Sequence, residues 1–188
     1  SFGKHATAQP SQISFENSLA IDVLKKREQG INHFVLENES RIVGSCSVPL
    51  ELHRRMQGAP IVLLQDSFES RVERILRDYV IRLREEFRQL HGPEQGDVQF
   101  ASRLTDSMAR IRKRLGGALH QELDAILQSA LQTQLANGDT ALHRDWISRL
   151  LEDYYDPMYR YQHGKVSERV VFSGDQSAVL EYLLQSGN

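Results

Sequence analysis

Hydrophobic residues recur every three or four positions through most of the chain, which is the spacing of amphipathic helices. The pattern predicts helices over residues 14–30, 49–58 and 68–90, each followed by a glycine or a polar break. Asp66 and Glu69 stand three positions apart at the start of the longest of these and predict a capping box. The first half of the chain is therefore predicted to contain three helices.

A second group of helices follows the sequence HGPEQG at residues 91–96. Apolar positions again recur at helical spacing over residues 97–115, 119–131 and 140–154, and no strand pattern separates them. This arrangement predicts an all-α insertion over residues 93–163. On the helix predicted over residues 68–90, arginines and glutamates alternate along the face opposite the apolar stripe, which is typical of a solvated surface.

Short apolar runs with strand character flank the helical region. Residues 31–36 and 61–65 predict two buried strands, and residues 169–172 predict a third strand that precedes a last helix. The sequence therefore predicts an α/β fold over residues 1–92, interrupted by the insertion and resumed over residues 164–188. Strands that alternate with helices favour a parallel sheet of the P-loop NTPase or kinase-like kind.

The phosphate-binding loop of that fold is missing. No Gly-x-x-x-x-Gly-Lys-Ser/Thr sequence occurs, and Gly3-Lys4-His5 lacks both the upstream glycine and the hydroxyl residue. In kinase-like sheets the strand that leads into this loop lies between those predicted at residues 31–36 and 61–65. We therefore expect an incomplete P-loop NTPase-like sheet, and three well-paired adjacent parallel strands would contradict that expectation.

The composition excludes several classes of protein. The chain has 188 residues, 40% of them hydrophobic and 26% charged, and no apolar run reaches the roughly 20 residues of a membrane helix. A net charge of -2 excludes a protein that is basic over its whole surface. The lone Cys46 excludes an internal disulfide and a Cys-rich zinc site, and favours a cytoplasmic location and a small buried thiol. The start at Ser1, without an initiator methionine, predicts a fragment.

Polar residues that follow the first predicted strand form one candidate site. Glu37 or Glu39 would hold magnesium through water or orient a nucleophile, and Arg41 would meet a phosphate, although a solvated loop with a local salt bridge explains them equally well. Arg71 and Arg74 lie one helical turn apart, near the end of the second predicted strand. These five residues are the candidate phosphate or diphosphate ligands. No catalytic residue and no metal site is assigned.

The densest positive charge precedes Gly116. We call this group the basic cluster: Arg110, Arg112, Lys113 and Arg114. Cations stabilise a helix C-terminus in any protein. Alternatively, the cluster binds the phosphates of an RNA backbone, which would make binding dependent on salt.

Four of the six tyrosines fall within eight positions. They form the tyrosine cluster: Tyr154, Tyr155, Tyr159 and Tyr161. Tyrosine combines a stacking face with a hydroxyl group, so the cluster is either a packed helix corner or a platform for planar ligands. Arg160 lies among the rings, and we expect Asp153 and Asp156 to hold it. Pro157 is expected to end or bend the helix.

Four sequence stretches carry a resemblance to a known family. They are residues 14–17 (SFEN), 36–44 (LENESRIVG), 112–116 (RKRLG) and 152–162 (EDYYDPMYRYQ). Together they closely resemble tRNA 2-selenouridine synthase, and the resemblance covers nearly the whole chain. The tyrosine-rich stretch is long and unusual, and it is the most specific of the four.

The resemblance implies a bacterial enzyme that modifies the wobble uridine of certain tRNAs. In that family, 2-thiouridine is geranylated from geranyl diphosphate and then converted to 2-selenouridine with selenophosphate. A rhodanese-like domain with the catalytic cysteine and a Walker A segment belong to the family's chain and are absent here. We therefore expect this chain to be inactive alone and to need those segments as partners. No cofactor is assigned to it, and Cys46 has no claim to the catalytic role.

The resemblance also implies roles for the candidate residues. The basic cluster would grip tRNA phosphates, while Arg160 and the tyrosine cluster would stack on bases or shape the pocket. Arg41, Arg71 and Arg74 would share the charge of the diphosphate. Two other interpretations stay open: a small-molecule kinase or NTPase domain, which would transfer a phosphoryl group, and a non-enzymatic helical interaction module, which would not bind tRNA.

Overall fold

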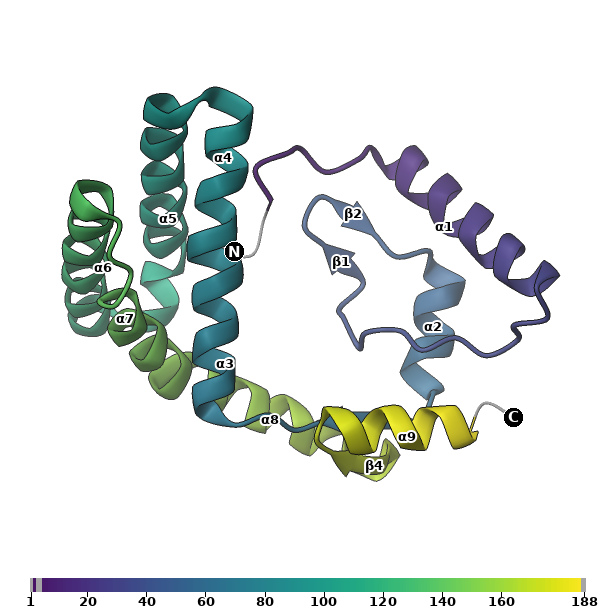
Figure 1. Ribbon diagram of the computed structural model, residues 1–188. Helices are drawn as coiled ribbons and strands as arrows, with labels where there is room; N and C mark the ends of the chain where they lie inside the picture. Colours follow the sequence, from purple (N-terminus) through teal and green to yellow (C-terminus); the bar gives the residue numbers. More distant parts are fainter. Residues whose placement is uncertain (1, 3–4, 187–188) are drawn as a thin grey trace. The chain divides into compact units, whose positions relative to one another are not determined.

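The computed structural model describes Phe2 and residues 5–186, which pack as two units (Figure 1). The helical unit comprises Asp66–Lys165 together with Phe2 and residues 5–6. The α/β unit comprises Thr7–Gln65 and the described residues from Val166 onward. The sequence division had placed residues 66–92 with the α/β part, whereas their contacts group them with the helices.

One long helix begins the helical unit. It runs through α3 (Phe68–Ile75), a π-helical stretch (Leu76–Arg82) and α4 (Leu83–His91) without a break. Ser67 caps it, because its hydroxyl accepts a hydrogen bond from the Ser70 amide at 3.1 Å. Asp66 instead binds Arg74 at 2.6 Å. The predicted capping box of Asp66 and Glu69 was therefore wrong.

Four more helical segments complete this unit. They are α5 (Pro93–Leu115), α6 (Gly117–Asn137), α7 (His143–Leu150) and α8 (Asp156–Val166), the last two joined by a π-helical stretch (Leu151–Tyr155). Figure 1 shows α4, α5 and α6 lying side by side. The helices predicted here from hydrophobic spacing are thus formed. The last of them does not end at Pro157, which lies in the first turn of α8.

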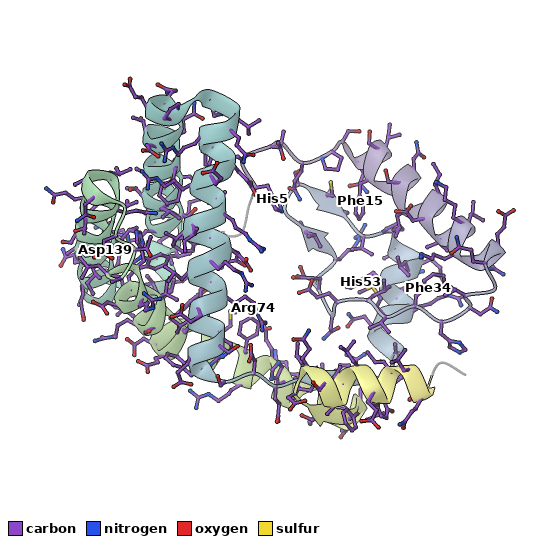
Figure 2. All side chains as sticks on the ribbon, viewed as in Figure 1. His5, Phe15, Phe34, His53, Arg74 and Asp139 are labelled. Carbon is purple, nitrogen blue, oxygen red and sulfur yellow. The ribbon has the colours of Figure 1, made fainter. Side chains whose placement is uncertain are left out.

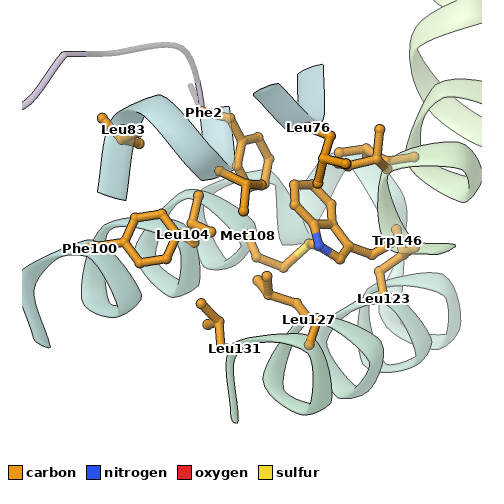
Figure 3. Close-up of a cluster of buried hydrophobic side chains, with 14 of the residues drawn as sticks. Phe2, Leu76, Leu83, Phe100, Leu104, Met108, Leu123, Leu127, Leu131 and Trp146 are labelled. Atoms are coloured by element: carbon orange, nitrogen blue, oxygen red, sulfur yellow. The ribbon is translucent and has the colours of Figure 1, made fainter. Parts of the chain in front are cut away.

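The core of the helical unit is apolar and closely packed. Phe100, Leu104, Met108, Leu123 and Leu127 have no exposed surface (Figure 3). Their spacing of three or four residues on α5 and α6 is the pattern that predicted these helices. Each of these helices is therefore held in the unit by the burial of one stripe of apolar side chains.

A contact between aromatic rings and a close helix approach at a glycine also contribute to the packing of this unit. Phe2 is buried and stacks on Trp146, with ring centroids 5.3 Å apart. Gly96 lets α5 approach α4 closely, because a β-carbon at this position would lie 2.6 Å from the backbone of Arg88.

A buried polar group lies beside these rings. The Trp146 indole N–H donates to His143 Nδ1 at 2.9 Å, and His143 Nε2 lies 2.9 Å from Gln134 Oε1. Because an indole nitrogen only donates, Nδ1 is the acceptor and Nε2 carries the proton. His143 is fully buried, and its burial lowers its pKa from 6.5 to about 4. A neutral imidazole therefore makes both hydrogen bonds, one to Trp146 and one to Gln134.

The α/β unit begins with α1 (Gln12–Glu28), which Ser11 caps, a hairpin of β1 (Ile42–Val43) and β2 (Cys46–Ser47), and α2 (Leu50–Gly58). Its parallel pair is β3 (Ile61–Leu64) with β4 (Val170–Gly174), reached through a 3₁₀ turn (Ser167–Arg169). Helix α9 (Gln176–Ser186) ends the described chain, and Asp175 caps it by accepting from the Ala178 amide.

The strand predicted over residues 31–36 is not formed. Residues 31–40 are irregular and exposed throughout, with Phe34 42% and Val35 71% exposed (Figure 2). A strand needs a neighbouring strand with which to pair, and residues 31–36 pair with none among the described residues. The parallel sheet consequently has two strands in this part of the chain, so the three-stranded arrangement that would have contradicted an incomplete sheet does not occur there.

Two expectations from composition can be compared with the structure. Cys46 is 3% exposed and donates from Sγ to the Pro10 carbonyl at 3.4 Å, as expected for a small buried thiol. Among the described residues, no helix combines the length and the apolar character that a membrane crossing requires.

Candidate functional site

The tyrosine cluster lies on a helix with an unusual local geometry. Pro157 has no amide hydrogen to donate to the preceding turn. The five residues before Asp156 are π-helical, so the chain accommodates the proline without ending the helix. Stretches of this kind are frequent at functional sites.

Aromatic rings follow one another along this helix. Tyr154 meets Tyr155 edge to face at 4.9 Å between centroids, and Tyr155 stacks with Tyr159 at 6.3 Å. Tyr159 in turn lies 6.2 Å from the ring of His163. The rings form a series from the π-helical stretch into α8.

Exposure divides the tyrosines into two pairs. Tyr154 and Tyr155 are half-buried against the core, and burial raises the pKa of Tyr155 to about 12. Tyr159 is 46% exposed, and Tyr161 is 68% exposed with the Lys165 ammonium 4.3 Å from its ring centroid. The first pair packs against the core, whereas the second pair has much of its surface exposed.

The basic cluster meets the tyrosine cluster at one contact. Arg114, at the end of α5, donates from Nη1 to the Tyr154 hydroxyl at 3.5 Å. Arg110 lies 3.9 Å from Asp106, one turn earlier on the same helix. Arg112 and Lys113 are exposed, and no ion pair is found for either within the described residues. Two groups about 40 positions apart in the sequence therefore share one region of the helical unit.

Arg71 and Asp156 join the long helix to the tyrosine-bearing helix. The guanidinium donates to both carboxylate oxygens, at 2.5 and 2.8 Å. These hydrogen bonds hold the pKa of Asp156 below its usual range and raise the pKa of Arg71. The pair fixes the start of α8 against α3.

Arg160 is not held as the sequence had suggested. The carboxylates of Asp156 and Asp153 bind Arg71 and Arg149 respectively. Arg160 donates from Nε to the backbone carbonyl of Asp156 at 3.4 Å, and among the described residues it forms no ion pair. The prediction was wrong because two other arginines compete for the same carboxylates.

A hollow of about 470 Å³ opens beside the Arg71–Asp156 pair. Its lining combines charged, aromatic and imidazole groups: Arg71, Glu152, Asp156, Tyr159, Arg160 and His163. The sequence did not single out Glu152 and His163. Positions 152, 156, 160 and 163 are three or four residues apart, which is the spacing of one face of a helix. This spacing is the signal that could have grouped Glu152 and His163 with Asp156 and Arg160.

The other candidate residues are not gathered in this region. Arg74 (Figure 2) lies on α3 and is engaged with Asp66. Glu37, Glu39 and Arg41 belong to the α/β unit, in the exposed irregular segment. They do not lie at the carboxyl end of a strand, as the sequence predicted, because that strand is not formed. No group of three or more potential metal ligands occurs within the described residues.

The fold is that of a mostly helical α/β protein with a small parallel sheet. Exposed cations, exposed tyrosine rings and a polar hollow lie in one unit. The sequence profile of a family described as the tRNA 2-selenouridine synthase AAA domain matches residues 1–188. The chain belongs to this family.

Curated relatives agree with this assignment. The chain is 61% identical over 183 residues to a protein of Azotobacter vinelandii and to one of Pseudomonas putida, and 60% identical to one of Pseudomonas syringae. Each of these relatives is named tRNA 2-selenouridine synthase. The matches cover 97% of this chain but 50% of each relative, so the chain spans about half their length. No solved structure matches it significantly.

Proposed function

We propose that this chain is the tRNA-binding and substrate-positioning part of an enzyme that converts the wobble uridine of tRNA to 2-selenouridine. The relatives' names support the activity, and their greater length supports a division of labour with further segments. The observation that carries the proposal is the contact between Arg114 and Tyr154, which brings the basic cluster to the tyrosines. Phosphate binding and base stacking can then act on the same RNA.

The exposed cations of the basic cluster take the first role. Arg112 and Lys113 have no ion pair among the described residues, so neither loses one when it binds a phosphate. Arg110 and Arg114 extend the same patch. Binding should therefore release counterions and weaken as salt rises.

The exposed rings take the second role. Tyr159 and Tyr161 are the most accessible members of the tyrosine cluster, and Arg160 stands between them in sequence. Single-stranded loop bases can leave their stack and pack on tyrosine rings or guanidinium planes. Tyr155, which stacks with Tyr159, would support that ring.

The chemistry of the whole reaction involves small substrates as well. Geranyl diphosphate and selenophosphate are the proposed donors, and a rhodanese-like domain and a Walker A segment are the proposed partners. Arg71 and Arg74 would contact a diphosphate only by exchanging Asp156 or Asp66 for a ligand oxygen. Glu37, Glu39 and Arg41 stay candidates for this substrate on the α/β unit.

The proposal is tested by tRNA binding at several salt concentrations with Arg112→Ala and Tyr159→Ala. Loss of Arg112 should weaken binding of every tRNA and reduce the slope of affinity against salt by about one. Loss of Tyr159 should weaken mainly the substrate tRNA, by about 1–3 kcal/mol if one base is stacked, and should leave the slope unchanged.

Arg82→Ala is the matched control. It removes an exposed arginine of the same unit that is paired with Asp78 and lies outside the proposed surface. Its affinity and salt slope should equal those of the unmodified protein. Unchanged tRNA affinity in both test variants would contradict the proposal.

A further inference from the structure

The hollow beside the Arg71–Asp156 pair has a lining suited to one kind of ligand. Its walls come from two helical elements, with Arg71 from α3 and the other groups from the helix that carries the tyrosines. The Arg71 guanidinium and the Asp156 carboxylate bind each other through two hydrogen bonds, so this part of the wall is fixed before any ligand arrives. A volume of about 470 Å³ lies within the range of about 300–1,000 Å³ typical of small-molecule sites.

The charges of the lining disfavour a small, highly charged anion as the ligand. Two arginines and two carboxylates line the hollow, and one of each is already paired. The remaining Arg160 offers a single guanidinium, while Glu152 would repel a highly charged anion. A ligand with one phosphate and a neutral planar ring fits this balance better.

The aromatic groups provide the surface for such a ring. Tyr159 contributes its exposed ring to the hollow, and its two flanking rings, Tyr155 and His163, lie 6.3 and 6.2 Å away between centroids. The ring is therefore supported along the helix and still open to the hollow. Stacking on a tyrosine suits any nucleobase, because every base has a π-face.

We infer that this hollow holds one unstacked nucleotide of the tRNA anticodon loop, with Tyr159 stacked on the base and Arg160 bound to its phosphate. The inference rests on the proposed function and adds a residue-level pocket to it. A loop nucleotide fits, because only single-stranded bases can turn outward without breaking a helix. The Arg71–Asp156 pair acts as the fixed wall that positions the ring and the guanidinium.

Photocrosslinking gives the first test. A set of tRNAs, each with one 5-iodouridine at a single anticodon-loop position or in the acceptor stem, is irradiated with the protein, and crosslinked peptides are mapped by mass spectrometry. We expect Tyr159 to crosslink to a single loop position and not to the stem. Crosslinks spread evenly over the positions, or none at Tyr159, would overturn the inference.

Matched variants separate the hollow from the helix that carries it. Tyr159→Phe keeps the ring and should keep the crosslinked position, whereas Tyr159→Ala should lower its yield about tenfold or more. Gln162→Ala changes an exposed residue of α8 that does not line the hollow and has no part in the proposed binding surface. It should leave the yield per bound tRNA unchanged at the Tyr159 position.

The phosphate contact has its own test. A neutral methylphosphonate is placed at the nucleotide that crosslinks, and tRNA affinity is measured with the unmodified protein and with Arg160→Gln. If Arg160 binds that phosphate, each change alone should weaken binding about tenfold, and the two together should weaken it no further. Fully additive losses would contradict the contact.

The outcomes distinguish this inference from the proposed function. Salt-dependent tRNA binding that needs Arg112 but gives no Tyr159 crosslink would overturn the nucleotide pocket alone. An absence of tRNA binding to the unmodified protein would overturn both.

Discussion

Asp156 lies close to two arginines and binds the side chain of one. Arg71 takes both carboxylate oxygens, and Arg160 is left with the backbone carbonyl of the same residue. Two parallel N–H···O bonds restrict orientation as well as distance, which makes this geometry the stronger of the two. Residue spacing within the tyrosine-rich stretch favoured Arg160, because the partner from α3 is distant in the sequence.

Replacing Asp156 tests what this pair contributes. Asp156→Asn should lower the free energy of unfolding at pH 7 by about 1–2 kcal/mol, because a half-exposed pair with two charged hydrogen bonds is lost. Urea denaturation followed by circular dichroism measures the change. Asp153→Asn, which breaks a more exposed pair with Arg149, should cost less than about 1 kcal/mol.

The same pair has a defined pH dependence. The pKa of Asp156 is lower in the folded protein than in the unfolded chain, so its contribution is present above the unfolded pKa and is lost as pH falls through the folded value. The difference in stability between the original protein and Asp156→Asn should therefore shrink in acid. A constant difference down to the lowest pH would contradict this role.

Individual residues were predictable from sequence where the chemistry is local. The cations at the end of α5 and the clustered tyrosines are visible as composition, and the structure brings Arg114 to Tyr154. Partner choice was not predictable, because Asp66 and Asp156 each lie near more than one arginine. Helical spacing alone does not rank those partners.

At the scale of elements, the helices were predictable from their stripes of apolar residues. Isolated apolar runs did not indicate whether a strand would form. A helix satisfies its backbone hydrogen bonds internally, so its sequence pattern is sufficient to indicate it. A strand depends on a neighbour. Residues 61–64 pair with β4 and form β3, whereas residues 31–36, which are also mostly apolar, have no such neighbour in the described chain.

Gly96 tests the contact between α4 and α5. Gly96→Ala should lower the unfolding free energy by about 2 kcal/mol, because the added β-carbon would lie within 2.7 Å of backbone atoms of Arg88 and Phe87. In an open helical position the same change is stabilising by about 1 kcal/mol. Thermal and chemical denaturation measure the cost.

Gly117→Ala provides the comparison. Gly117 lies at the start of α6, where an added β-carbon would meet nothing within 4 Å, and its φ is not in the left-handed region. This substitution should leave stability unchanged or raise it slightly. Equal effects at the two glycines would show that the close approach at Gly96 contributes nothing.

At the scale of the whole molecule, most of the buried residues belong to the helical unit. Its centre includes His143, whose imidazole accepts from Trp146 and faces Gln134 without contact with solvent. The division into two units was only partly predictable. Residues 66–92 follow a strand in sequence, but their apolar stripe packs on α5.

The pH dependence of overall stability follows from His143. Its pKa is about 4 in the folded protein and 6.5 for an exposed histidine of the unfolded chain, so the unfolded chain takes up a proton first as pH falls. Stability should be fully present above pH 6.5 and should decline by about 3 kcal/mol toward pH 4. Urea denaturation at stepped pH values measures this decline.

His143→Gln isolates the effect. Glutamine keeps an acceptor for Trp146 but has no titrating group in this range. The variant should be less stable at pH 7 and should show a smaller loss between pH 6.5 and 4. An equal loss in both proteins would assign the decline to other groups.

The parallel pairing of β3 with β4 has a consequence for the order of folding. Leu64 and Gly174 are partners in the sheet, yet the whole of Asp66–Lys165 separates them along the chain. Bringing such distant segments together from an unstructured chain has a high entropic cost, which compact helices formed beforehand reduce. The two strands should therefore pair late, after the helices have collapsed, so a slow-folding helical variant would also delay the sheet.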